Sequence, residues 1–199
     1  MDALIDVDRL ARLHDQTVER WHAGPIVNDE RDAFYALALT NHAFNFQLWH
    51  EEDQARDPAA DDAVIARVKH AIDGFNQQRN DAMERIDEWV LATLAARGAS
   101  PDGTAPLHSE TVGAIVDRLS ILALKIFHMH EQTLRTDAEP AHIESCRAKL
   151  ATLREQRADL AGALAGLDAD LRVGRKRFKV YRQMKMYNDP TLNPILYGG

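Results

Sequence analysis

Residues 41–57 read NHAFNFQLWHEEDQARD, and this stretch decides how the rest of the chain has to pack. At 100° per residue, its apolar side chains fall on two roughly opposite sides of a helix. A helix with two apolar sides is expected to be central and covered by neighbours. A polar stripe runs between the two sides and consists of Asn41, Asn45, Glu52 and Arg56. Burying such groups without partners costs about 1–3 kcal/mol each. The stripe therefore predicts either a closed polar network or a cleft that a ligand completes.

The composition of the chain is typical of a soluble protein with one domain. Its 199 residues are 45% hydrophobic and 28% charged, which is enough for one sizeable core. No apolar stretch approaches the ~20 residues that span a membrane, and the start, MDALIDVDRL, lacks the basic and apolar regions of a signal peptide. The single Cys146 excludes an intrachain disulfide and thiolate zinc sites. We therefore expect one cytoplasmic domain over residues 1–199.

Hydrophobic periodicity predicts five main helices and no strand. They are expected near residues 3–23, 29–56, 62–97, 109–136 and from 137 onward. Leucines at three- and four-residue spacing from Leu150 to Leu171 indicate that the fifth helix packs as an antiparallel or coiled-coil-like partner. The pattern allows this helix to continue past Gly174 until Asn-Asp-Pro at 188–190, with an extended tail after it. The sequence thus predicts an all-α bundle with a basic C-terminal helix end.

Residues 171–188 form a basic segment with seven arginines and lysines and no acid, whereas the whole chain has a net charge of −7. Two interpretations follow from a basic segment on an acidic body. The segment either docks onto the acidic body or binds an anion such as a phosphate or a nucleotide. The net charge argues against nucleic-acid binding.

Four long motifs carry a resemblance to a known family. They read NHxFNFxLWHEEDxAR at 41–56, IDxxNQxRNDxxExID at 72–87, SETxGxxxDRLSILALKIxHM at 109–129 and YRQxKMYNDPxLNP at 181–194. In this order they resemble an uncharacterised bacterial domain-of-unknown-function family of about this length. That family is associated with gene neighbourhoods for surface-polysaccharide or lipopolysaccharide synthesis and with glycosyltransferases. The resemblance implies an all-α, bacterial, cytoplasmic protein and supplies no catalytic residues.

Carboxylates at helical spacing suggest a magnesium site. The proposed ligands come from the second and third helices and are Glu52, Asp53, Asp81 and Glu84. Magnesium prefers such oxygen ligands, although a solvated helix face produces the same pattern. A di-iron bundle is disfavoured because its Glu-x-x-His motif is missing. Zinc is disfavoured because His42, His50, His128 and His130 include no tight pair along a helix.

Acid–base chemistry without a metal is a second possibility. His42 and Asp53 share one helix face, as do Asp117 and His128, and each pair is eleven residues apart. If the second and fourth helices pack antiparallel, His42 faces Asp117, or His128 faces Asp53. A buried His–Asp pair suits a general base, but such pairs also tie bundles together without chemistry.

Two functions are consistent with these patterns. The first is an enzyme or binding protein for an anionic small molecule, such as a nucleotide or sugar nucleotide, with a magnesium-dependent phosphohydrolase as one form of it. Its expected ligand-binding residues are Asn41, Asn45, Trp49, Asn80, Arg118, Lys125, Arg182, Lys185, Tyr187 and Asn188. The alternative is a non-catalytic accessory protein that docks on a glycosyltransferase or forms a homo-oligomer through its leucine seam.

Overall fold

The computed structural model describes residues 2–99, 103–184 and 190–197, and its fold is all-α, as predicted. The helices are α1 (Val7–Ala23), α2 (Ala33–Gln54), α3 (Asp62–Ala96), α4 (Val112–Thr133), α5 (Pro140–Arg172) and the short α6 (Pro194–Tyr197). The described residues form no strand, and their one β-bridge joins Leu107 to Arg177. Within the same residues, every helix is too short or too polar to cross a lipid bilayer.

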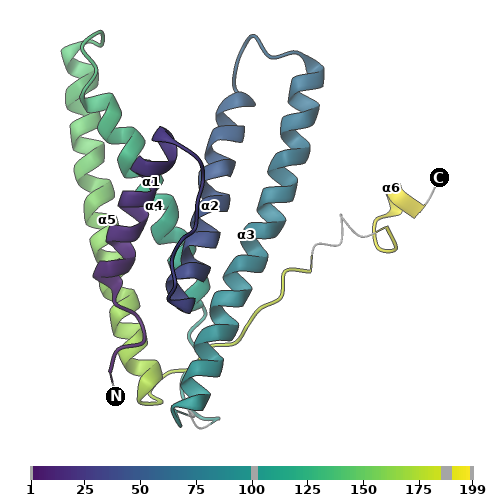
Figure 1. Cartoon of the computed structure of the whole chain (residues 1–199), viewed down its shortest axis with the longest axis vertical. Helices are drawn as coiled ribbons and strands as arrows, with labels where there is room; N and C mark the ends of the chain where they lie inside the picture. Colours follow the sequence, from purple (N-terminus) through teal and green to yellow (C-terminus); the bar gives the residue numbers. More distant parts are fainter. Residues whose placement is uncertain (1, 100–102, 185–189, 198–199) are drawn as a thin grey trace.

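The long helices form two antiparallel hairpins, α2–α3 and α4–α5, which diverge toward one end of the molecule (Figure 1). α1 packs against α4, α2 and α5. α1, α2 and α4 run in the same direction, and α3 and α5 return in the opposite one (Figure 1). α2 is thus contacted by three helices, α1, α3 and α4, as its two apolar sides predicted.

Side-chain caps determine where the helices begin. Asp6, Asp32 and Asp61 accept hydrogen bonds from backbone amides in the first turns of α1, α2 and α3, and Thr111 does so in α4. α1, α2 and α4 therefore begin a few residues later than the periodicity predicted. Periodicity marks the buried face of a helix but does not show which of several nearby acids or hydroxyls caps it.

The end of α5 differs from the continuation that the sequence allowed. The helix ends at Arg172, and Gly174 follows with a positive φ of 71°. Arg177 then donates its backbone N–H to the carbonyl of Pro106 and accepts one from His108, so the chain is extended here. The basic segment is therefore not a helix end, because its backbone pairs with the loop before α4.

The described part of the basic segment binds acids of the same chain. Arg182 forms ion pairs with Glu84, at 2.6 Å, and with Glu88, both on α3. Lys176 pairs with Asp170 at 3.1 Å. These contacts agree with the interpretation that the segment docks onto the acidic body of the chain.

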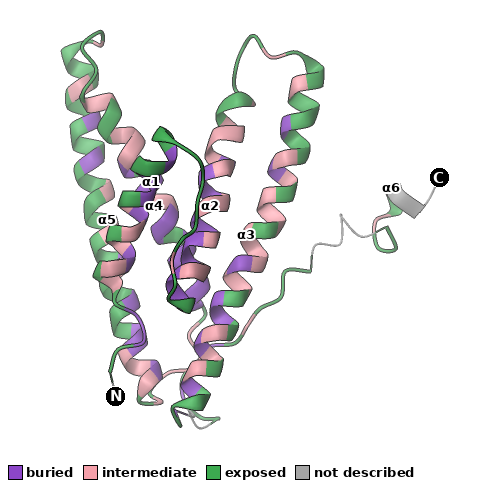
Figure 2. Ribbon diagram, viewed as in Figure 1, coloured by how far each residue is buried: buried purple, intermediate pink, exposed green. Residues whose placement is uncertain are grey.

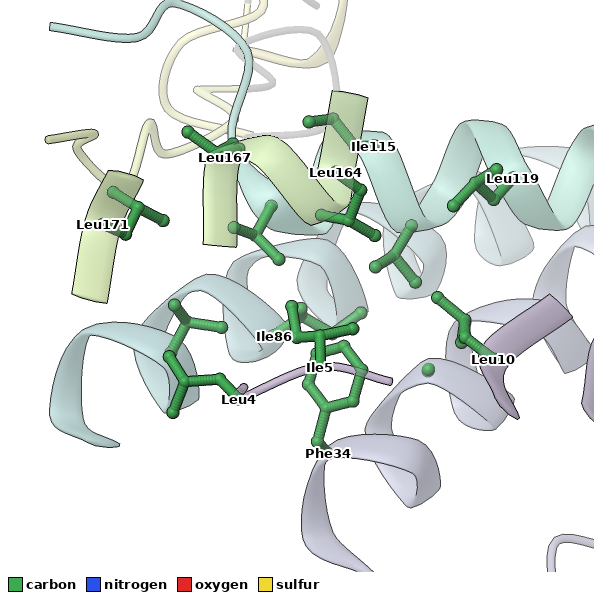
Figure 3. Close-up of a cluster of buried hydrophobic side chains, with 14 of the residues drawn as sticks. Leu4, Ile5, Leu10, Phe34, Ile86, Ile115, Leu119, Leu164, Leu167 and Leu171 are labelled. Carbon is green, nitrogen blue, oxygen red and sulfur yellow. The ribbon is translucent and has the colours of Figure 1, made fainter. Parts of the chain in front are cut away.

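The core is densest at the end where the two hairpins converge, opposite their connecting loops, and buried residues of all five long helices meet there (Figures 1, 2 and 3). Its largest members include Leu10, Phe34, Ile86, Leu164 and Leu167. Residues of α5 on the leucine seam pack here, which accounts for their three- and four-residue spacing. A second cluster lies further along α1, α2 and α4 and contains Val18, Trp21, Phe46 and Leu124.

Candidate functional site

The polar stripe of α2 closes a network around a buried carboxylate. Asp117 on α4 is 3% exposed. Its Oδ1 accepts hydrogen bonds from Nδ2 of Asn41 at 3.0 Å and from Nδ2 of Asn45 at 2.9 Å. Arg79 on α3 donates Nε to Oδ1 at 2.7 Å and Nη2 to Oδ2. The bidentate geometry of the Arg79–Asp117 pair fixes how the two side chains face each other. The network therefore fixes the positions of α2, α3 and α4 along one another.

Ser120 extends the network toward α1. Its Oγ lies 2.7 Å from Nδ1 of His42 and accepts a hydrogen bond from Asn45 at 3.0 Å. The ring of His42 packs against His14 of α1, with centroids 4.5 Å apart, and against Trp21. The buried polar groups therefore form one connected set across four helices.

Burial keeps His14 and His42 uncharged. Desolvation lowers the pKa of His14 to about 3, with a smaller contribution from the charge of Arg157. Desolvation also lowers the pKa of His42 well below its ordinary value, and the neighbouring His14 adds to this. Both rings are therefore neutral at pH 7 and shielded from solvent.

A cavity of about 360 Å³ lies beside the network, between α2, α3 and α4. Its polar wall consists of Asn45, Glu52, Asp53, Arg56, Asn76 and Arg79, and its apolar wall of Leu48, Trp49, Ile121 and Leu124. Asp53 and Arg56 are exposed, and Arg56 pairs with Glu52 at 2.6 Å. Of the two alternatives predicted for the stripe, Asn41 and Asn45 represent the closed network, whereas Glu52 and Arg56 line a cavity for which a ligand stays a prediction.

Arg79 connects the network to the cavity. The hydrogen bond to Asp117 raises the pKa of its guanidinium, while burial opposes the rise. Asp117 occupies Nε and Nη2, and Nη1 forms no hydrogen bond within the described residues. Because the carboxylate fixes the plane of the guanidinium, Nη1 remains as an oriented donor on a residue that lines the cavity.

A second buried carboxylate, Asp87, joins α3 to the start of α4. Its Oδ1 accepts the backbone N–H of Gly113 at 2.7 Å. Burial raises the pKa of Asp87 to about 6, and hydrogen bonds from Thr111 and Gly113 oppose the rise. A Cβ on Gly113 would lie 2.3 Å from the carbonyl oxygen of Met83, so this crossing requires glycine.

Comparison with known proteins identifies a family whose function is unknown. A family model described as "Protein of unknown function (DUF4254)" matches residues 35–180, well over half of the chain. The chain belongs to the DUF4254 family. No curated protein and no solved structure matches it. The family membership inferred from the motifs is therefore confirmed, and the matched residues include α2, α3, α4 and α5 apart from the first two residues of α2.

In this DUF4254 chain, the four acids expected to bind magnesium do not meet. Glu52 and Asp53 line the cavity, whereas Asp81 accepts a hydrogen bond from Gln77 and Glu84 pairs with Arg182. Among the described residues, the one group of three histidine, cysteine or acidic side chains close enough to share an ion is formed by His22, His50 and His128. Glu52, Asp81 and Glu84 therefore have separate partners, and those of Glu52 and Asp81 lie close by in the same stretch of chain.

The expected histidine–aspartate pairs do not form either. His42 bonds to Ser120, and Asp117 is taken up by Asn41, Asn45 and Arg79. His128 instead lies beside Glu131, with Nδ1 2.9 Å from Oε2. The pairing assumed that α2 and α4 are antiparallel, but they run in the same direction (Figure 1). The parallel direction puts His42 level with Ser120 and so separates it from Asp117.

Three cations expected to hold a phosphate, Arg118, Lys125 and Arg182, are not among the residues that line the cavity. Arg118 pairs with Glu110 at 2.6 Å and, with Lys125, lines a groove between α4 and α5. Arg182 is bound to acids of α3, and Asn80 lines a different cavity that Tyr181 helps to form. The three remaining expected residues, Lys185, Tyr187 and Asn188, lie outside the described residues.

Of the expected ligand-binding residues in this DUF4254 member, Asn45 and Trp49 line the cavity, and Asn41 supports it. The sequence reasoning missed Arg79, which is central to the site. Arg79 lies three residues after Asn76, so both fall on one face of α3. That spacing was an available signal, but the predictions for this helix used Asn80, Asp81 and Glu84 and left Arg79 out.

Proposed function

We propose that the cavity between α2, α3 and α4 binds a small hydroxylated molecule with one anionic group, such as a sugar phosphate. The observation that carries this proposal is the guanidinium of Arg79, a residue of the cavity wall, which Asp117 holds in place and whose Nη1 has no hydrogen-bond partner among the described residues. Arginine held in this way suits a phosphate, because its donors are already oriented.

The other lining groups suit a sugar ring. Glu52 and Asp53 are acceptors for hydroxyl groups, and Asn45 and Asn76 offer both a donor and an acceptor. Trp49 offers an apolar ring for one face of a pyranose. The acids and arginines of the wall balance in charge, which favours a ligand with one anionic group over a triphosphate.

The size of the cavity narrows the ligand class further. Its volume of about 360 Å³ is at the lower end of the range for ligand pockets, roughly 300–1,000 Å³. A monosaccharide phosphate fits such a volume better than a complete sugar nucleotide does.

Calorimetric titration of the chelator-treated chain tests the proposal. The ligands are a set of hexose phosphates, the matching hexoses and inorganic phosphate. We expect one hexose phosphate to bind at least about tenfold more tightly than either fragment, a difference of about 1.4 kcal/mol. The absence of binding by every hexose phosphate, or equal binding of phosphate alone, contradicts the proposal.

Variants locate the binding. Arg79→Lys keeps the positive charge but loses the planar fork, so it should weaken the hexose phosphate at least about tenfold. Trp49→Leu should weaken the hexose phosphate and leave inorganic phosphate unaffected. Arg67→Gln, an exposed arginine of α3 outside the cavity, is the matched control. Thermal melting of each variant separates lost binding from lost folding.

A further inference from the structure

The three parallel helices α1, α2 and α4 stack their side chains in layers. Each layer takes one residue from each helix, and successive layers are four residues apart, a rise of about 6 Å. The layers are His14, His42 and Ser120, then Val18, Phe46 and Leu124, then His22, His50 and His128. The third layer therefore brings three imidazoles to one level near the ends of these helices.

We propose that His22, His50 and His128 form a binding site for a divalent transition-metal ion, with Zn²⁺ the best match. One ring nitrogen from each residue lies within 4.8 Å of the other two. Tetrahedral zinc with Zn–N bonds of about 2.0–2.1 Å needs nitrogens about 3.3 Å apart. Small rotations of the side chains would bring the nitrogens from their present separations of up to 4.8 Å to the shorter separation that zinc requires.

Hydrogen bonds at Nδ1 leave Nε2 of two of these histidines available to an ion. Nδ1 of His22 lies 2.7 Å from the carbonyl oxygen of Val18, and Nδ1 of His128 lies 2.9 Å from Oε2 of Glu131. In each case Nδ1 carries the proton and Nε2 has a free lone pair. Metal-bound histidines in proteins have the same arrangement, with a carbonyl or carboxylate behind the ring.

One of these nitrogens is otherwise unexplained. Nε2 of His128 is buried and has no hydrogen-bond partner among the described residues. A buried polar atom without a partner destabilises a fold, and a bound cation supplies the missing partner.

Aromatic rings restrict how these histidines turn. Trp49 stacks on His128 with centroids 4.7 Å apart and planes 8° apart. Phe127 stacks on His22 at 4.4 Å, and Phe46 contacts both His22 and His50. The ligands are thus held near the required positions before an ion arrives, which lowers the entropy lost on binding.

The donor set selects the class of ion. Three neutral imidazoles suit Zn²⁺, Ni²⁺, Co²⁺ or Cu²⁺, whereas Mg²⁺ and Ca²⁺ require oxygen ligands. His22 is exposed, so water can reach the ion as the fourth ligand. A three-histidine site with an open position is of the kind that activates water. Trp49 stacks on His128 and also lines the cavity, so it lies between the two sites.

Titration of the chelator-treated full chain with Co²⁺ tests the site. We expect the visible absorption of four-coordinate Co²⁺ to saturate at one ion per chain and to disappear on adding Zn²⁺. Zn²⁺ should also raise the melting temperature, whereas Mg²⁺ should not. The hexose phosphate titration is performed without metal, so either proposal can fail while the other stands.

Substitutions identify the ligands. His22→Gln and His50→Gln should weaken Zn²⁺ at least about 100-fold, and Glu131→Gln, which alters only the support behind His128, about tenfold. Two controls should bind Zn²⁺ as the wild type does. They are His130→Gln, in the same turn of α4 as His128, and His142→Gln, beside Cys146.

The absence of saturable Co²⁺ binding, or unchanged Zn²⁺ affinity in His22→Gln, overturns the proposal. Because His22 is exposed, we expect that variant to fold, and its thermal melting curve without metal checks this.

Discussion

His14 and His42 determine how this protein responds to acid. Burial lowers the pKa of both below 6.5 in the folded state, for His14 to about 3. The unfolded chain therefore binds more protons below pH 6.5 than the folded chain does, and stability falls as the pH falls from about 6.5 toward 3. Each histidine contributes about 1.4 kcal/mol per pH unit in that window. Asp87 acts in the opposite sense, because its pKa of about 6 is raised on folding, and partly offsets the loss between about pH 6 and 3.8.

Urea unfolding at pH 7 and pH 5 checks this prediction. The wild type should lose about 2 kcal/mol for each buried histidine over this interval, less the gain from Asp87. Glutamine at position 14 does not titrate. The free energy of unfolding of His14→Gln should therefore change less steeply with pH than that of the wild type, by the equivalent of about one proton. His130→Gln, at an exposed position, should keep the wild-type slope. An unchanged slope in His14→Gln would refute the assignment.

At the scale of the element, the crossing of α3 and α4 depends on Gly113. Gly113→Ala places a Cβ 2.3 Å from the carbonyl of Met83 and 3.1 Å from Oδ1 of Asp87, so the two helices have to separate. We expect a loss of about 3 kcal/mol in the free energy of unfolding, as for other overpacked contacts. Chemical denaturation gives the value directly.

Gly162→Ala is the matched control within α5. Nothing lies within 4 Å of a Cβ at Gly162, and alanine has the higher helix propensity. This variant should gain about 0.5–1 kcal/mol. Similar destabilisation by both substitutions would show that the clash at Gly113 is not the cause.

At the scale of the whole molecule, the described part of the basic segment is held on the bundle by Arg182. Its partners Glu84 and Glu88 are on α3, about a hundred residues earlier in the chain. Arg182→Glu replaces attraction by repulsion, so chymotrypsin should cleave within residues 178–184 several times faster. High salt should have the same effect on the wild type, because the ion pairs are exposed. Lys179→Glu, also an exposed position, is the control and should cleave at the wild-type rate.

Much of the fold and part of the site follow from local patterns. Apolar periodicity predicts the all-α class, the five long helices and the central place of α2. This periodicity depends only on residues within a few turns of a helix. The polar stripe of α2 likewise singled out Asn41 and Asn45, but it did not decide between a closed network and a ligand site. Arg79 was within reach of the same reasoning, because its spacing from Asn76 places both on one face of α3.

The sequence by itself determined which face of each helix is buried, and only the tertiary structure decided what that face meets. The parallel direction of α1, α2 and α4 puts His42 level with Ser120, and His50 level with His22 and His128. These partners are far apart in the chain, so no spacing along one helix predicts them. The sequence argument against zinc considered pairs within a helix and therefore missed this layer. The physical reason is that helical periodicity specifies an angle around one axis, whereas a shared site also requires the direction and register of the neighbouring axes.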